Sequence, residues 1–205
     1  MTATGKLDQA YQVEGPEEVE AFYDGWAEGY DAELAENGYV TPRRCAEALA
    51  RHAEDPTEPV ADFGCGTGLS GAALREAGFT VIDGFDFAEE MLERAREKGL
   101  YRNLARCDLT KPLEIEPGSY AAAAAIGVIN PDYMPPTAID EILGTLRPGG
   151  VMVFSLNDNA LKDGTMVARL NDLIDTRTAD LLEAEHGPHI EGTGLEATVY
   201  VLRKR

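Results

Sequence analysis

Cationic side chains are scarce in this sequence of 205 residues, because 18 Lys and Arg stand against 37 Asp and Glu, for a formal net charge of −19. So acidic a chain repels phosphate backbones and anionic lipids, and we expect neither a nucleic acid nor a membrane as partner. Cysteines are also few. Cys45, Cys65 and Cys107 are widely spaced and form no CxxC motif or Cys/His cluster, which argues against a disulfide framework and against a metal site.

Long apolar runs are missing as well. The longest, over residues 121–129, is far shorter than the roughly 20 residues of a membrane-spanning helix, and residues 1–13 lack the apolar core of a signal peptide. We therefore expect a cytoplasmic protein. Its length and its hydrophobic content of 44% fit one globular domain. Within that domain we expect a flexible arm over 1–15, a helical cap over 16–55 and a core over 56–205.

Hydrophobic periodicity predicts two helices in the cap. The first begins at Pro16 and carries an aromatic stripe that extends to Tyr30, which either packs in the core or closes over a ligand. The second begins with Thr41 as its N-cap, followed by Pro42.

Beyond the cap, short strands alternate with helices, and Gly and Pro mark the joints. Strands are expected at 59–63, 79–85, 103–107, 120–129 and 151–156, and helices at 69–77, 88–98, from 135 or 136, and at 164–174. A final antiparallel hairpin is expected from 179–185 and 195–202. This alternation predicts a doubly wound α/β sheet.

Three glycines lie where the first strand of this core passes into a helix. Gly64, Gly66 and Gly68 permit backbone angles closed to other residues, and they let a ligand approach the main chain. The unpaired N–H groups of the following helix suit an anionic group. The spacing is not the G-x-G-x-x-G of dinucleotide binders, and no Gly-Lys-Ser/Thr of a P-loop follows.

Two aspartates follow the next two strands. Asp86 lies about twenty residues after Gly64, where an acidic side chain of a doubly wound fold accepts hydrogen bonds from ribose hydroxyls. Asp108 follows the third strand and suits an exocyclic amine such as that of adenine. Each also has a plainer interpretation, because Asp86 can cap the next helix and Asp108 can be a solvated loop residue.

Four motifs occur in order along the chain. They are Asp62-x-Gly64-x-Gly66-x-Gly68, then Asp86 with Ala88-Glu89-Glu90-Met91-Leu92, then Cys107-Asp108-Leu109, then Leu146-Arg147-Pro148-Gly149-Gly150. From about Tyr23 to Arg205 the chain resembles the class I S-adenosylmethionine-dependent methyltransferases, and among them the Williams–Beuren critical-region methyltransferase-like proteins. This resemblance implies a Rossmann-like, mostly parallel sheet of seven strands in the order 3-2-1-4-5-7-6 and S-adenosyl-L-methionine as cofactor.

The resemblance also implies which residues contact the cofactor. Its amino-acid arm would be lined by Gly64, Gly66, Gly68, Asp62 and Tyr30, with Asp62 facing the ammonium and Tyr30 closing over the arm. The nucleoside would be held by Asp86 on the ribose hydroxyls, by Phe87 on the adenine ring, and by Asp108 and Leu109 at the adenine amine and face. Ile126 and Gly127 would pass under the sulfonium.

No motif fixes the methyl acceptor. Weak catalytic candidates are Asp132, Tyr133, Asn157 and His186, for which a turn, loop or surface position is the plainer and favoured interpretation. The Asn-Pro-Pro-Tyr motif of nucleic-acid base methyltransferases is absent, because Asp132 replaces its second proline. We therefore expect a methyltransferase that acts on a small molecule. The alternatives are a cofactor-binding module without methyl transfer and, third, a nicotinamide-dependent oxidoreductase.

Overall fold

The computed structural model describes residues 5–10, 13, 15–131 and 134–205. Its centre is a seven-stranded sheet, and the strands lie side by side in the order β3 (Asn103–Arg106), β2 (Ile82–Asp86), β1 (Val60–Phe63), β4 (Tyr120–Ala125), β5 (Leu146–Asn157), β7 (Leu195–Lys204) and β6 (Ala179–Ile190). Strands β1 to β5 pair in parallel, whereas β7 runs antiparallel to both β5 and β6. The expected strand order and the final hairpin are therefore confirmed.

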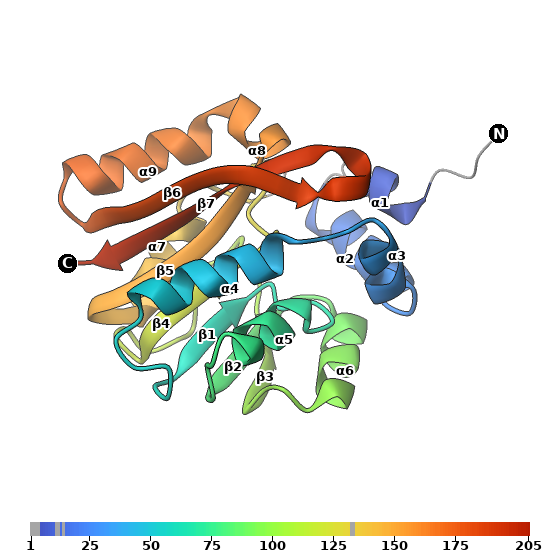
Figure 1. Cartoon of the computed structure of the whole chain (residues 1–205), viewed down its shortest axis with the longest axis horizontal. Helices are drawn as coiled ribbons and strands as arrows, with labels where there is room; N and C mark the ends of the chain where they lie inside the picture. Colours follow the sequence, from blue (N-terminus) through green and yellow to red (C-terminus); the bar gives the residue numbers. More distant parts are fainter. Residues whose placement is uncertain (1–4, 11–12, 14, 132–133) are drawn as a thin grey trace.

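Helices cover both faces of the sheet (Figure 1). They are α4 (Thr41–His52), α5 (Leu69–Glu76), α6 (Glu89–Lys98), α7 (Ala138–Thr145), α8 (Asp158–Asp163) and α9 (Thr165–Asp175). Alternate residues of β4 point to opposite faces. Ala122 packs in one hydrophobic cluster with residues of α4 and α5, and Ala123 packs in the other with residues of α7 and α9. Each face therefore has its own core.

Alanine forms nearly all of the central strand β4. Alanine is a poor strand former, but β4 lies between β1 and β5 with helices on both faces, so tertiary packing decides its conformation. The strand is shorter than predicted. It ends at Ala125, and Gly127 has a positive φ of 70°, so the chain leaves the sheet well before Ile129.

The cap differs from its prediction, because two short helices replace the single one expected from Pro16 to Tyr30, and a further short helix lies in the predicted arm. They are α1 (Lys6–Gln9), α2 (Pro16–Trp26) and α3 (Tyr30–Glu36). The carboxylate of Glu33 joins them: Oε2 accepts from Nε1 of Trp26 at 2.8 Å, and Oε1 accepts from the backbone N of Leu7 at 2.9 Å. Leu7 is buried as well, so this part of the predicted flexible arm is helical and packed on the cap.

Three local predictions are corrected. Thr41 does not cap its helix, because Val40 occupies the N-cap position and the Thr41 hydroxyl pairs instead with Nδ1 of His189 at 2.7 Å. Helix α8 was not expected. Strand β6 continues through Gly187 and Pro188, which the sequence suggests as a break, because β6 lies at the edge of the sheet, where proline is tolerated.

Among the residues that the structure describes, none of the helices combines the length and the apolar character that crossing a lipid bilayer demands.

Candidate functional site

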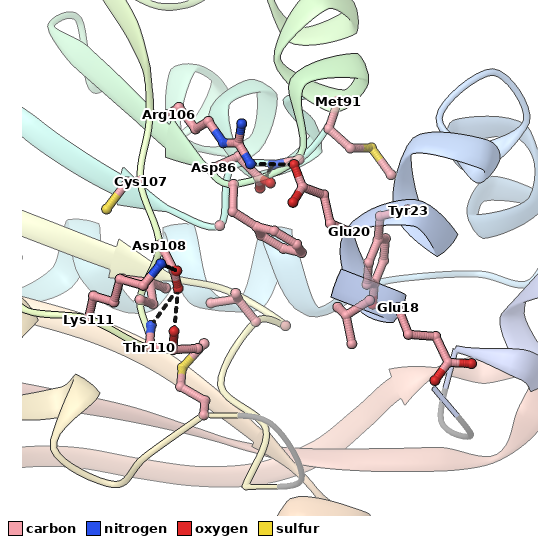
Figure 2. Close-up of a pocket in the computed structure, with 18 of the residues that line it drawn as sticks. Glu18, Glu20, Tyr23, Asp86, Met91, Arg106, Cys107, Asp108, Thr110 and Lys111 are labelled. Carbon is pink, nitrogen blue, oxygen red and sulfur yellow. Dashed lines mark hydrogen bonds and ion pairs between the residues drawn. The ribbon is translucent and has the colours of Figure 1, made fainter. Parts of the chain in front are cut away.

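The parallel strands β1, β2, β3 and β4 end at the same edge of the sheet. Register aligns Phe63 with both Phe85 and Ala125, and Asp86 with Arg106, so the residues that follow each strand converge there. At this edge lies a cavity of about 850 Å³ (Figure 2). Its position outside the carboxyl ends of a doubly wound sheet is where such folds bind their ligands.

The glycine loop over residues 64–68 forms one wall of this cavity, which is the larger of two adjoining cavities. Gly64, Gly66 and Gly68 all have positive φ, at 68°, 52° and 95°. A Cβ on Gly64 would lie 2.4 Å from the side chain of Val128, whereas one on Gly66 would meet no atom within 4 Å. Only glycine therefore lets the loop pass Val128, and Gly66 leaves open space beside its backbone.

Asp86 is the buried carboxylate of the cavity. Its Oδ2 accepts from the backbone N of Gly66 at 2.8 Å and its Oδ1 from that of Ala88 at 3.0 Å, so it fixes the loop and begins α6. Desolvation by burial raises the pKa of Asp86, although these backbone hydrogen bonds oppose the shift. A carboxylate offers about four acceptor positions, so two backbone bonds leave capacity for ligand hydroxyls.

Asp108 also lines the cavity and is more exposed than Asp86 (Figure 2). Its Oδ1 accepts from the backbone N and the hydroxyl of Thr110, and its Oδ2 pairs with Nζ of Lys111 at 2.7 Å. Desolvation raises the pKa of Asp108, but the bonds from Lys111 and Thr110 outweigh it, and the pKa lies below its usual value. Asp108 is therefore ionised at neutral pH.

The cap supplies the opposite wall. Glu18, Val19, Glu20 and Tyr23 of α2 line the cavity together with Tyr30 of α3. Sequence reasoning did not single out the two glutamates as site residues.

Arg106, Lys111 and Thr110 are further lining residues that sequence reasoning missed. Their signal was available, because each lies at or just after the end of the third strand.

Most of the predicted cofactor contacts meet in this one cavity. Those that line it are Tyr30, Gly64, Gly66, Asp86, Phe87, Asp108, Leu109, Ile126 and Gly127. Two do not line it, Asp62 and Gly68. Gly68 is the N-cap of α5, where a Cβ would approach the ring of Tyr101 at 3.3 Å.

Asp62 lies fully buried beneath the glycine loop instead of facing the cavity. Its Oδ2 accepts from the hydroxyls of Ser70 at 2.7 Å and Tyr101 at 2.8 Å. Its Oδ1 is the single fully buried side-chain oxygen or nitrogen without a hydrogen bond among the described residues. Desolvation raises the pKa of Asp62 from 3.8 to about 7. Asp62 thus holds the loop in place from behind.

Of the four weak catalytic candidates, the two that the structure describes, Asn157 and His186, do not line the larger cavity. Asp132 and Tyr133 lie outside the described residues. His186 is exposed on the hairpin, does not line the larger cavity, and pairs with Thr198 and Glu196. Asn157 is the N-cap of α8, where its Oδ1 accepts from Ala160 N at 2.9 Å.

Residues 60–150 match the family model described as "Methyltransferase domain". The chain is 35% identical over 142 residues to human Methyltransferase-like protein 27, an alignment that covers 68% of this chain and 58% of that protein. The chain belongs to the class I S-adenosylmethionine-dependent methyltransferases.

Other relatives align over shorter stretches. Trans-aconitate 2-methyltransferase of Agrobacterium fabrum is 33% identical over 110 residues, which cover 52% of this chain and 41% of that protein. Ubiquinone biosynthesis O-methyltransferase of Neisseria meningitidis is 28% identical over 114 residues, which cover 53% and 48%. The chain thus spans between two-fifths and three-fifths of the length of these relatives.

Solved structures share the fold at low sequence identity. The [4+2]-cyclase SpnF has a TM-score of 0.69 at 18% identity and covers 91% of this chain and 95% of its own. A complex of the Haloferax volcanii Trm112 methyltransferase activator with a methyltransferase has a TM-score of 0.67 at 18% identity, covering 89% and 96%. These likenesses establish the fold alone.

S-adenosylmethionine, the cofactor of this family, suits the larger cavity in charge and shape. The described lining contains four carboxylates, Glu18, Glu20, Asp86 and Asp108, against two cations, Arg106 and Lys111, which favours a positively charged ligand. The open space beside Gly66 admits a ligand against the main chain. Phe87, Met91 and Leu109 offer apolar surface for an adenine ring.

Proposed function

We propose that this protein transfers the methyl group of S-adenosylmethionine to a small-molecule acceptor. The convergence of Gly66, Asp86 and Asp108 on one cavity at the carboxyl edge of the sheet carries the proposal. The names of two relatives support a small acceptor, since one is a trans-aconitate and the other a ubiquinone-biosynthesis methyltransferase.

Residue roles belong to the same proposal. Asp86 accepts hydrogen bonds from the ribose hydroxyls while it keeps its bonds to the loop. Phe87 and Leu109 enclose the adenine, and Asp108 accepts from the adenine amine. Gly64 and Gly66 receive the amino-acid arm, and Tyr30 covers it.

The cofactor supplies an electrophilic methyl group, so the protein chiefly has to position and enclose the reactants. Holding an acceptor at near-attack distance contributes much of the rate in such a displacement. Ile126 and Gly127, directly after the end of β4, define the point from which the methyl group is delivered. Asp62 acts through the loop as a positioning residue.

We also propose a cytoplasmic location. The three cysteines are free, two of them buried, and nothing in their spacing calls for an oxidising compartment.

Isothermal titration with S-adenosylhomocysteine tests the cofactor site, and binding in the micromolar range is expected. Incubation with methyl-labelled S-adenosylmethionine and a deproteinised metabolite pool then tests transfer. Label should appear in the low-mass fraction and vanish with Asp86→Ala. Absence of S-adenosylhomocysteine binding at high micromolar concentration would refute the proposal.

The alternative is a cofactor-binding module without methyl transfer. It is favoured by one observation: among the described lining of the larger cavity there is no histidine, and the candidate His186 lies elsewhere. Binding of S-adenosylhomocysteine without label transfer to metabolites or macromolecules would select this alternative.

A further inference from the structure

A second, smaller cavity of about 50 Å³ adjoins the larger cavity. Tyr23, Tyr30 and Gly127 line both cavities, so the two meet at the point to which the proposed function assigns the sulfonium. The smaller cavity lies between the cap and the final hairpin, since Trp26 lines it from one side and His189 from the other.

Gly127 fixes how closely the two cavities approach each other. A Cβ on Gly127 would lie 2.3 Å from the hydroxyl oxygen of Tyr39, so that hydroxyl stands directly over the glycine backbone. The backbone N of Gly127 donates to Oγ of Ser155 at 2.9 Å, which holds the segment in this position. A group at the junction of the two cavities would therefore lie against the Gly127 backbone and the side chains of Tyr23 and Tyr30.

His189 lines this cavity, and one of its ring nitrogens makes no hydrogen bond with a described residue. Its Nδ1 pairs with the hydroxyl of Thr41, whereas Nε2 has no hydrogen bond to any described residue. In the described part of the chain, Oδ1 of Asp62 is the only fully buried polar side-chain atom that lacks a hydrogen bond. Nε2 of His189 lacks a hydrogen bond too, so it is not fully buried. Although His189 is only 4% exposed, its Nε2 therefore reaches accessible space.

Every polar side chain in the described lining of the smaller cavity is neutral at physiological pH. These side chains are Tyr23, Trp26, Tyr30, Tyr39, Asn130, Asn157 and His189. Desolvation by burial lowers the pKa of His189 to about 4, so its imidazole is uncharged. The described lining contains no Asp, Glu, Lys or Arg. A carboxylate placed there would be an unpaired buried charge, whereas a hydroxyl group would find a hydrogen-bond partner.

Two charged groups act on His189 from outside the cavity. Arg44 lowers its pKa and Asp158 raises it, and both effects are smaller than that of burial. The guanidinium of Arg44 donates to the carbonyl oxygens of Pro188, Ala197 and Glu185. Because Arg44 is bound to these carbonyls and does not line the cavity, it is not placed to pair with an anionic acceptor.

We propose that the smaller cavity holds the reacting end of the methyl acceptor and selects an uncharged hydroxyl group over a carboxylate. The proposal rests on the proposed function and adds its acceptor class. A volume of about 50 Å³ is several times the roughly 10–15 Å³ that holds one water molecule, so it admits a few heavy atoms. The rest of the acceptor would extend into the larger cavity.

The single tryptophan of the chain makes binding in this cavity measurable. Trp26 is the only Trp of the sequence and lines the smaller cavity. The protein is first saturated with S-adenosylhomocysteine and then titrated with benzyl alcohol or with benzoate, which share a ring and differ in the end group. Benzyl alcohol should change the Trp26 fluorescence at a concentration at least tenfold lower than benzoate does. Equal or tighter binding of benzoate, or no response to either probe, would overturn the proposal.

A pair of variants on one strand locates the selectivity. His189→Phe keeps a ring against Tyr39 and removes Nε2 together with the Nδ1 that pairs with Thr41, whereas His186→Phe makes the same change at an exposed position outside both cavities. His189→Phe should weaken the binding of benzyl alcohol at least fivefold and keep the affinity for S-adenosylhomocysteine within twofold. His186→Phe should change neither affinity. Unchanged benzyl alcohol binding in His189→Phe would contradict the assignment of Nε2.

Two further outcomes are distinguishable. If His189→Phe does not fold because the buried Thr41 loses its partner, the comparison of the two probes on the unmodified protein still decides. If S-adenosylhomocysteine does not bind, the proposed function itself fails, whereas its binding together with a preference for benzoate removes only the acceptor class.

Discussion

Glu20, on helix α2 of the cap, forms an ion pair with Arg106, the last residue of β3, and both side chains line the larger cavity (Figure 2). The pair links two walls of the cavity, the cap and the end of β3, which are far apart in the sequence. Because both residues are partly exposed, the pair is worth no more than about 1 kcal/mol and is weakened by salt.

Breaking this pair should loosen the cap slightly. Glu20→Gln is expected to weaken the binding of S-adenosylhomocysteine by up to about fivefold at low ionic strength and hardly at all in molar salt. Titration calorimetry at the two salt concentrations measures both values. The ion pair that Arg94 forms with Glu97 lies outside the cavity, so Glu97→Gln serves as the control and should leave the affinity unchanged.

Removal of the Asp86 side chain should abolish tight cofactor binding. Asp86→Ala deletes the two ribose contacts that we propose for it, worth ~1–3 kcal/mol each, so S-adenosylhomocysteine should bind at least about 30-fold more weakly. The matched control is Asp83→Asn, because Asp83 is buried on the same strand but pairs with Arg102 and Tyr120 away from the cavity. That control should lower the melting temperature and spare the affinity. Equal losses of affinity in both variants would contradict the ribose assignment.

Asp62 should make the protein less stable as the pH rises. Its pKa increases from 3.8 to about 7 on folding, so the folded state binds the extra proton between these values. Stability therefore falls as pH rises from about 4 through 7, by an amount on the order of 4 kcal/mol at most. The raised pKa of Asp86 acts in the same direction.

Asp62→Asn removes the titration while keeping an oxygen for Ser70 and Tyr101. Urea unfolding at pH 5 and pH 8 should show a clearly smaller difference in the variant than in the unmodified protein. If the two proteins lose the same stability between these pH values, Asp62 does not titrate as the burial implies.

Glycine at position 66 should matter to the ligand more than to the fold. Gly66→Ala and Gly78→Ala both place a Cβ at positive φ in space that is empty within 4 Å, so each should cost roughly 1–2 kcal/mol of stability. Of these two glycines, Gly66 lines the larger cavity and Gly78 does not. Calorimetry should therefore find weaker S-adenosylhomocysteine binding in Gly66→Ala alone, and an equal affinity in both variants would exclude an approach of the ligand to this backbone.

The strand ends of the core were predictable from sequence, because each combines a short apolar run with glycine or aspartate. Gly64, Asp86 and Asp108 follow neighbouring parallel strands, and parallel strands end at one edge whatever the details of packing. The cap was less predictable. The spacing of Trp26 and Tyr30 suits one helix or two, and the choice depends on Glu33, whose contacts are tertiary.

The hairpin shows a second limit of sequence reasoning. His186 and His189 flank a Gly-Pro pair, which predicts a break in the chain although both histidines lie on one continuous strand. The strand places Nε2 of His186 near Glu196 and buries His189 against Thr41 and Tyr39. Which of the two reaches a cavity was therefore decided by long-range pairing and not by local pattern.

The alanine strand β4 has a consequence for how this molecule tolerates change. From Ala121 to Ala125 its side chains are single methyl groups, and those of Ala122 to Ala125 are buried, so almost any substitution there adds bulk. Such bulk would spread the two helical layers and displace the segment that leads to Gly127. Variation that alters ligand preference without unsettling the centre is consequently confined to the helices and the hairpin that enclose the cavities.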